Sequence, residues 1–188
     1  MICSILFGEE IEVKIISYPE QVILGEPGYV VAEMRNISGK EIAVGSVGEC
    51  YEGNFIVERA DGRKRKRVVV EQRCKIRSER FLEVLPIAWR GLKSEDIFAY
   101  YEDEPGRFRV WFELHLSCDY VIDKETAKEV KALKGIFKSQ EVYIDLLFPE
   151  GIDREAYEYF KGYPLARPEE LLEKYPTSIY AGWALFRM

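Results

Sequence analysis

The clearest pattern along the chain is a strict alternation of apolar and polar residues over 107–117. The apolar phase, which we expect to face a core, holds Phe108, Val110, Phe112, Leu114 and Leu116. The opposite phase, which we expect to face solvent, holds Arg107, Arg109, Trp111, Glu113, His115 and Ser117. An alternation of this length predicts a strand with one buried and one solvated face, as in an antiparallel β-sandwich.

Shorter segments with the same two-residue period predict further strands of a mainly β fold. They are residues 11–15, 29–36, 41–44, 81–85, 97–101 and 141–148. Segments 55–59 and 66–71 flank the dipeptide Asp61-Gly62, which supplies the positive φ that a tight turn requires. We therefore predict that these two segments form a β-hairpin.

The strand period is interrupted between the last two predicted strands. Ala127, Val130 and Leu133 follow a helical spacing there, and Asp123 is a suitable N-cap residue. The sequence therefore predicts one helical insertion in the sandwich, from Asp123 to about Leu133.

The composition changes after the last predicted strand, where helix signals replace the strand period. Asp153 is a candidate N-cap, Pro168 suits the first position of a helix, and 179–186 has the pattern of a final helix. We therefore divide the chain into a sandwich over 9–148 and a short C-terminal α-helical segment over 149–188.

Residues 1–8 form an apolar stretch that ends abruptly at two glutamates. Two alternatives explain this stretch: it is the first strand of the fold, or it is the rear part of a signal peptide that lacks its basic start. No apolar run in the sequence approaches the roughly 18 residues that a membrane helix needs, so no transmembrane segment is predicted.

The net charge of −6 provides no general attraction for nucleic acid, and we do not expect a nucleic-acid partner. One basic run departs from this acidic background: Arg63, Lys64, Arg65, Lys66 and Arg67. This run is a candidate contact for a polyanion, such as an acidic polysaccharide, an anionic lipid or a nucleic acid. The alternative, which we favour, is a solvated hairpin tip whose charge is balanced by the acidic remainder of the chain.

The sequence offers no catalytic set of residues. His115 is the single histidine, and neither a nucleophile nor an orienting acid is evident beside it. No nucleotide-binding, cofactor or metal motif occurs, so we predict no cofactor, no metal site and no enzymatic activity.

The outward phase of the 107–117 strand contains a candidate partner surface. Trp111 lies there with Arg109 and His115, and an exposed aromatic flanked by Arg109 and Glu113 is suited to anchor a protein partner or a carbohydrate. The alternative, which we favour, is that the helical insertion or the C-terminal segment covers Trp111.

The four cysteines are Cys3, Cys50, Cys74 and Cys118, and no two of them form a Cys-x-x-Cys pair. A zinc ribbon or a thioredoxin-like motif is therefore not expected. If the protein is exported, Cys50 and Cys74 are the candidate disulfide. The alternative is that they are buried thiols of a cytosolic protein.

Two segments of the sandwich region resemble the immunoglobulin-like domains of uncharacterised bacterial secreted proteins. Residues 24–38, LGEPGYVVAEMRNIS, are similar to the Gly-Glu-Pro, strand, Asn-x-Ser opening of such domains. Residues 104–110, EPGRFRV, are similar to the Pro-Gly entry of a late strand. The resemblance covers 9–148 and implies an immunoglobulin-like β-sandwich, and a fold alone does not determine a function.

The C-terminal segment resembles part of a tetratricopeptide-type helical repeat. Residues 171–184, LLEKYPTSIYAGWA, are similar to the end of one repeat and the start of the next. Stacked repeats need about three units to bury their faces. This segment is therefore expected either to pack on the sandwich or to be the beginning of a truncated solenoid.

These observations lead to a functional hypothesis. We expect a non-catalytic binding or structural module of the cell envelope or secreted fraction, with a protein partner. An accessory or inhibitor domain of a secreted peptidase system is the alternative, and a cytosolic enzyme with unusual acid–base residues is a third hypothesis. The expected location is secreted, periplasmic or cell-surface, and it is cytoplasmic if the chain starts at Met1.

Overall fold

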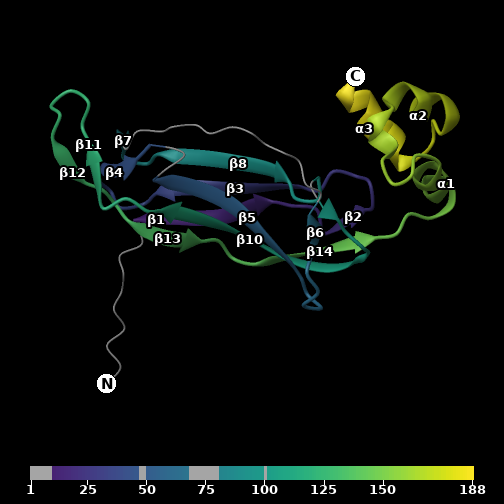
Figure 1. Ribbon diagram of the computed structural model, residues 1–188, viewed down its shortest axis with the longest axis horizontal. Helices are drawn as coiled ribbons and strands as arrows, with labels where there is room; N and C mark the ends of the chain where they lie inside the picture. Colours follow the sequence, from purple (N-terminus) through teal and green to yellow (C-terminus); the bar gives the residue numbers. More distant parts are fainter. Residues whose placement is uncertain (1–9, 47–49, 68–80, 100) are drawn as a thin grey trace.

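The computed structural model describes residues 10–46, 50–67, 81–99 and 101–188, and shows an elongated body of strands with helices at one end (Figure 1). The described chain is mainly β, its sheets are largely antiparallel, and three α-helices follow the last strand. The predicted mainly β class with a C-terminal helical segment is confirmed. Residues 1–8 lie outside the described ranges. Within those ranges, no helix is both long enough and apolar enough to cross a membrane.

Two sheets make up the body of the protein. The first has the antiparallel order β1 (Ile11–Ser17), β3 (Tyr29–Asn36) and β8 (Arg90–Asp96). The second is centred on β10 (Gly106–Leu116), with β5 (Tyr51–Arg59) on one side and β13 (Gly135–Lys138) and β14 (Val142–Leu147) on the other. A short parallel strand, β2 (Gln21–Ile23), follows β14 in this sheet.

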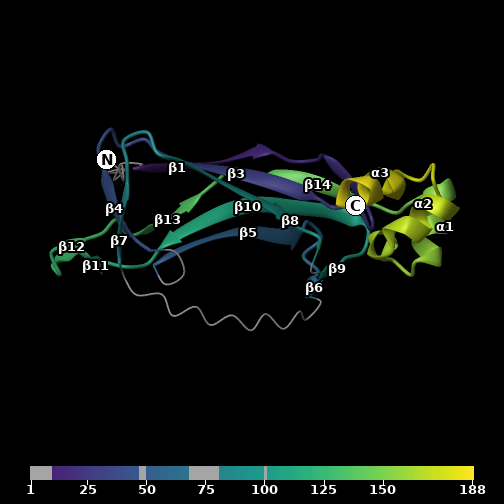
Figure 2. The same cartoon turned by 90° about the horizontal axis from the view of Figure 1, so that it is seen from above.

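Three small antiparallel pairs flank these sheets. They are β4 (Ile42–Gly45) with β7 (Leu82–Leu85), β6 (Lys66–Arg67) with β9 (Tyr101–Glu102), and β11 (Tyr120–Ile122) with β12 (Glu129–Lys131). The β11–β12 hairpin lies at the end of the molecule opposite the helices, which Figure 2 shows from above.

The two main sheets face each other across a shared apolar core. All five apolar residues of the β10 alternation are buried, as predicted. Phe112 and Leu114 of β10 belong to the same buried cluster as Val13 and Met34 of the first sheet. Burying a side chain of this size fully contributes about 1.5–3 kcal/mol, so the β10 alternation is a principal source of stability.

The predicted helical insertion from Asp123 to Leu133 is wrong, because this segment forms the β11–β12 hairpin. Asp123 does accept a hydrogen bond from a backbone N–H two residues on, as an N-cap would. The chain then reverses instead of coiling: Ala127 adopts a positive φ of 54°, and the Asp123 N–H donates to the carbonyl of Lys128. The same side-chain bond serves a turn or a helix start, and the turn prevails here.

The predicted hairpin between 55–59 and 66–71 is also wrong over its described residues. The tight turn exists, because Gly62 has a φ of 77° and its N–H donates to the carbonyl of Arg59. However, β5 pairs with β10 along its whole length, and β6 pairs with β9. Residues 68–71 lie outside the described ranges.

The strand predicted at 97–101 is displaced toward the N-terminus. The sheet strand is β8, which ends at Asp96, and residues 97–99 form a turn. Asp96 ends the strand because its side chain accepts hydrogen bonds from the N–H groups of Gly28 and Phe98.

The C-terminal segment forms α1 (Gly151–Tyr159), a 3₁₀ turn (Pro164–Ala166), α2 (Pro168–Lys174) and α3 (Ile179–Arg187). Pro168 begins α2 as predicted. Asp153 does not cap its own helix, because α1 begins two residues earlier. Its carboxylate accepts instead from the backbone N–H of Ile179, the first residue of α3, at 2.7 Å.

The helical segment packs on the sandwich, which is the first of the two arrangements expected for it. Its own buried cluster includes Ala156, Leu171 and Tyr180, and Ile23 of β2 packs against this cluster. The Tyr180 hydroxyl donates to the carbonyl of Leu24 at 2.6 Å. The helices therefore close their apolar faces against the turn between β2 and β3.

Candidate functional site

The outward face of β10 carries a row of interacting side chains. Arg109 forms ion pairs with Glu58 of β5 at 2.6 Å and with Glu141 at 3.4 Å. Its guanidinium carbon lies 5.2 Å from the centroid of the Trp111 ring, in a cation–π arrangement. The predicted outward phase thus places Arg109 and Trp111 side by side.

Glu113 connects the rest of this row. Its carboxylate accepts from the indole N–H of Trp111 at 2.8 Å, pairs with Lys138 of β13 at 2.6 Å, and lies 2.8 Å from Nε2 of His115. The hydrogen bonds from Lys138, Trp111 and His115, in that order of effect, lower the pKa of Glu113 to about 2. The structure therefore brings together all three residues of the predicted partner surface, and Glu113, which the sequence places on the same outward face, joins Trp111 to His115.

The predicted cover over Trp111 has to be revised. The helical insertion that was expected to provide it is a hairpin at the far end of the molecule, and the C-terminal helices lie at the opposite end (Figures 1 and 2). Trp111 is half-buried, and its described contacts are with Arg109 and Glu113 of its own strand. We call the row Arg109, Trp111, Glu113 and His115 the β10 outer row.

The lowered pKa of Glu113 predicts a pH-dependent contribution to stability. A depressed carboxyl pKa stabilises the fold fully above the ordinary value near 4.5, and this contribution is lost as the pH falls toward 2. Glu113→Gln is expected to lower the free energy of unfolding by about 1 kcal/mol at pH 7, since the exposed Lys138 and His115 partners are screened by solvent. Urea denaturation at pH 7 and pH 2.5 measures the difference.

Glu58→Gln is the matched control for this prediction, because Glu58 is half-exposed and its pair with Arg109 is a surface pair worth less than about 0.5 kcal/mol. At pH 2.5, the difference in free energy of unfolding between Glu113→Gln and the unmodified protein is expected to be close to zero. A difference that stays constant from pH 7 to pH 2.5 would contradict the assignment.

Two members of the basic run predicted as a polyanion contact, Arg63 and Arg65, pair with acids. Arg63 pairs with Asp61 at 2.9 Å and with Glu104 at 2.8 Å. Hydrogen bonds, first from Arg59 and then from Arg63, hold the pKa of Asp61 well below its ordinary value. The remaining members of the run are Arg65, which is taken up next, Lys64, which is exposed, and Lys66 and Arg67, which form β6.

Arg65 is a buried member of this run. Its side chain is 6% exposed and that of its partner Asp103 is 3% exposed. The Arg65 Nε lies 2.9 Å from a carboxylate oxygen of Asp103, and its Nη2 donates to the carbonyl of Ile97 at 2.8 Å. The guanidinium also lies 5.5 Å from the centroids of the Phe98 and Phe108 rings. Arg65 is therefore a structural anchor in this part of the fold.

A cleft of about 810 Å³ lies between the sandwich and the helical segment. One wall consists of the β2–β3 turn, the turn after β8, and the Arg63–Arg65 segment. The other wall consists of Tyr157 and residues 161–166. The two walls meet at Gly25, whose φ is 90° and where an added Cβ would lie 3.1 Å from Pro164 and 3.3 Å from Tyr157. The cleft thus exists because the helices dock closely on this turn.

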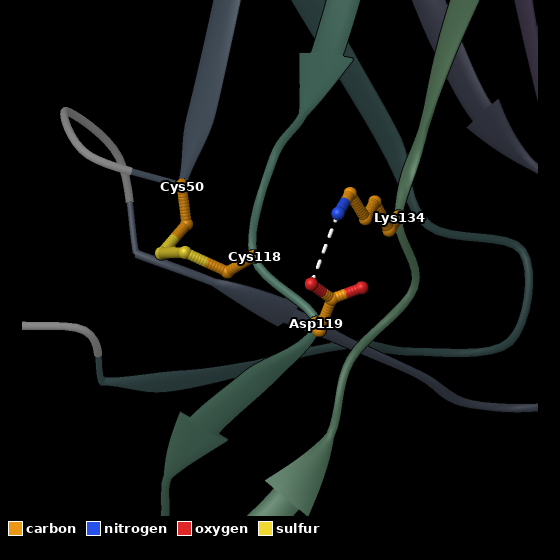
Figure 3. The surroundings of a disulfide bond; sticks show 4 residues. All are labelled: Cys50, Cys118, Asp119 and Lys134. Atoms are coloured by element: carbon orange, nitrogen blue, oxygen red, sulfur yellow. Dashed lines mark hydrogen bonds and ion pairs between the residues drawn. A yellow bond between two sulfur atoms is a disulfide. The ribbon is translucent and has the colours of Figure 1, made fainter.

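A disulfide joins Cys50 to Cys118, and the predicted pairing of Cys50 with Cys74 is wrong (Figure 3). Cys50 immediately precedes β5 and Cys118 follows β10 by two residues. These strands are antiparallel neighbours, and Tyr51 pairs with Leu116, so the register brings the two cysteines to a Cα separation of 5.1 Å. Cys74 lies outside the described residues.

The Cys50 half of the disulfide is enclosed by its surroundings. Cys50 is 1% exposed, and an added Cβ on Gly45 would lie 2.1 Å from the Cβ of Cys50, so only glycine fits there. Beside the bond, Lys134 pairs with Asp119 at 2.9 Å across the base of the β11–β12 hairpin (Figure 3). Among the described residues, no group of three or more His, Cys, Asp or Glu side chains is placed to hold a metal ion.

Comparisons with known proteins give little further information. No family model matches the chain, and a search among curated proteins gives no match. The chain is similar to part of a β-glucosidase from Listeria innocua, in crystal structures with gluconolactone and with glucose, at 12% sequence identity and TM-scores of 0.33 and 0.31. The match covers 73% of this chain and 16% of the β-glucosidase. A similarity of this size supports no conclusion about fold or activity.

Proposed function

We propose that this protein is a non-catalytic binding module of the cell envelope or secreted fraction, built on an immunoglobulin-like sandwich. The β10 outer row is the observation that carries the binding role. Arginine and tryptophan dominate binding hot spots at protein interfaces, and here both stand on the middle strand of a sheet. The proposed partner is a protein.

The order of the strands supports the immunoglobulin-like assignment. In an immunoglobulin domain, strands A, B and E are neighbours in one sheet and strands C, F and G in the other. The neighbours β1-β3-β8 and β5-β10-β14 have this same order along the chain. One feature departs from the pattern: the disulfide here links neighbours within one sheet, whereas that of antibody domains links the two sheets.

The disulfide supports the proposed location. Disulfides form and persist mainly in oxidising compartments, such as the extracellular space and the bacterial periplasm. Cys50 and Cys118 are held together by strand register, and Cys50 is shielded from solvent, so the bond is a structural one.

The fixed geometry of the β10 outer row supports a binding role. Ordering a long side chain at an interface costs about 0.5–1.5 kcal/mol when that chain is free beforehand. Arg109 and Trp111 are already held by Glu58, Glu141 and Glu113. A partner that contacts this row therefore meets side chains that these acids already orient.

Capture from the organism that encodes the chain tests the proposal. The full chain, tagged and expressed at native level, is compared with Trp111→Ala and Arg109→Ala, and with the control Tyr120→Ala, which removes a 56% exposed aromatic on the distal hairpin. We expect one protein to be captured in near-stoichiometric amount by the unmodified chain and the control, and at least tenfold less by the two β10 variants. Circular dichroism melting establishes that each variant is folded.

Equal capture by all four proteins would contradict the β10 outer row as the binding surface. Substrate turnover by the purified chain that a point substitution abolishes would contradict the non-catalytic assignment. Identification of the captured protein as a peptidase would favour the accessory or inhibitor role. Alkylation of intact cells followed by fractionation checks the location: recovery of the chain in the cytosol with Cys50 and Cys118 reduced would overturn it.

A further inference from the structure

The cleft between the sandwich and the helical segment contains two lysines without an acidic partner among the described residues. Lys64 lies on the sandwich wall and Lys161 on the helical wall, and both side chains are exposed. Lys64 is held between Arg63 and the buried Arg65, so its backbone is fixed on both sides. Lys161 has a positive φ of 52°, directly after α1. Two lysines therefore border the same cleft from opposite sides.

Three acidic side chains of the cleft, Glu26, Asp103 and Glu104, already have partners within the protein. Asp103 pairs with Arg65, and Glu104 pairs with Arg63. Both carboxylate oxygens of Glu26 accept hydrogen bonds, one from the Trp183 indole at 2.8 Å and one from the backbone N–H of Ile23, the last residue of β2, at 3.0 Å. The acids thus fix the walls, while the two lysines are left to interact with a ligand.

Asp96 adds an acceptor of a different kind to the cleft. One of its oxygens, Oδ1, accepts both of its backbone hydrogen bonds, from Gly28 at 2.9 Å and from Phe98 at 3.2 Å. The other oxygen belongs to a half-buried side chain that lines the cleft. A ligand hydroxyl that donates to this oxygen would leave the turn intact.

Aromatic and proline side chains complete the lining. Tyr163 is 61% exposed, and Tyr157 and Pro164 lie on the same helical wall. Tyrosine offers an apolar ring face together with a hydroxyl. The cleft volume of about 810 Å³ is within the range of sites that bind small molecules.

We propose that this cleft binds an acidic saccharide, a sugar whose ring carries a carboxylate. The carboxylate would interact with Lys64 and Lys161, ring hydroxyls would donate to Asp96, and the face of the sugar would lie on Tyr163. An extended peptide fits this surface less well, because peptides of that form add to an exposed strand edge and the walls here are turns and helix.

The charges of the cleft indicate a moderate affinity. Five basic side chains line it, Arg59, Arg63, Lys64, Arg65 and Lys161, against four acidic ones, Glu26, Asp96, Asp103 and Glu104. Asp61, which pairs with Arg59 and Arg63, offsets the one remaining positive charge. A dissociation constant of about 10 µM to 1 mM is expected, and it should weaken with added salt, since the two lysines are exposed.

Titration calorimetry on the full chain tests the proposal with three probes: trigalacturonate, neutral galactotriose and triglutamate. The variant is Lys64→Gln with Lys161→Gln. The matched control is Lys128→Gln with Lys131→Gln, which removes the same two charges from exposed positions of the β11–β12 hairpin at the other end of the molecule. Glutamine removes the charge, keeps an unbranched polar side chain that is one atom shorter, and suits the positive φ of Lys161 about as well as lysine does.

We expect trigalacturonate to bind at least tenfold more tightly than galactotriose or triglutamate. The cleft variant should lose at least tenfold in affinity, and the control variant less than twofold. No heat of binding at 5 mM trigalacturonate, or equal losses in the two variants, would overturn the site. Equal affinity for triglutamate would overturn the saccharide assignment. None of these outcomes bears on the β10 outer row, which lies on a different part of the surface.

Discussion

The Cys118→Ala variant is expected to have a free energy of unfolding about 4 kcal/mol lower than that of the unmodified protein. The bond closes a loop with a sequence separation of 68 residues, and in the chain-entropy account a loop of that length restricts the unfolded chain by this amount. Guanidinium denaturation of the oxidised proteins, followed by tryptophan fluorescence, gives the two free energies. Adding a thiol reductant to the unmodified protein should reproduce the loss.

Cys74→Ala is the control for this prediction, because it discriminates between the two pairings of Cys50. With Cys50 bound to Cys118, the Cys74→Ala variant keeps its disulfide, and the reductant lowers its stability as it does that of the unmodified protein. If reductant no longer lowers the stability of the Cys74→Ala variant, the result would support the pairing of Cys50 with Cys74 that was predicted from sequence. Peptide mapping without reduction identifies the bonded cysteines directly.

Arg65→Ala is expected to lower the free energy of unfolding by about 3–5 kcal/mol, because it leaves the carboxylate of Asp103 buried without its partner. Both side chains are almost fully enclosed, and the carbonyl of Ile97 loses its donor as well. The double variant Arg65→Ala with Asp103→Ala should cost less than the sum of the two single variants, because it removes both charges together. Urea denaturation of the four proteins completes this cycle.

Arg63→Ala is the matched control for the buried pair. Arg63 is two residues away and 59% exposed, and its pairs with Asp61 and Glu104 are surface pairs. Its loss should cost less than about 1 kcal/mol. Equal costs for Arg63→Ala and Arg65→Ala, or simple additivity in the Arg65–Asp103 cycle, would show that burial does not distinguish the two arginines.

The sequence predicts those parts of the fold that are determined within a single helix or strand, where the signal does not depend on the other elements. The alternation in β10 runs over eleven residues, so its buried and outward faces follow directly. Pro168 marks the start of α2 because its fixed φ and missing N–H suit that position. The same reasoning places Arg109, Trp111 and His115 on one face without any knowledge of their neighbours.

The errors arise where an observed local signal serves more than one structure. Asp123 hydrogen bonds to the backbone as a helix cap does, yet it closes a turn. The tight turn at Gly62 is real, yet the strand beside β5 comes from β10, distant in sequence. Strand partners depend on the packing of the whole sheet, which a local pattern does not contain.

The disulfide and the candidate sites depend on such distant partners. The pairing of Cys50 with Cys118 follows from the register of β5 and β10, and that register is not readable from the spacing of cysteines. Lys138 and Glu58 lie on neighbouring strands and form ion pairs with the β10 outer row, and these contacts are not readable from the sequence for the same reason. The cleft arises only when the helices dock, so Lys64 and Lys161 have no relation in the sequence alone.

The docking of α3 beside β2 has a mechanical consequence. β2 and β14 are parallel, so a pull that draws them apart along their axes would load all their hydrogen bonds in shear at once. However, α3 is fastened to the turn after β2 through Leu24 and Glu26. A tension on α3 therefore reaches both strands at the same end of their ladder. It draws them in one direction, so the docked helix shields the parallel pair from shear.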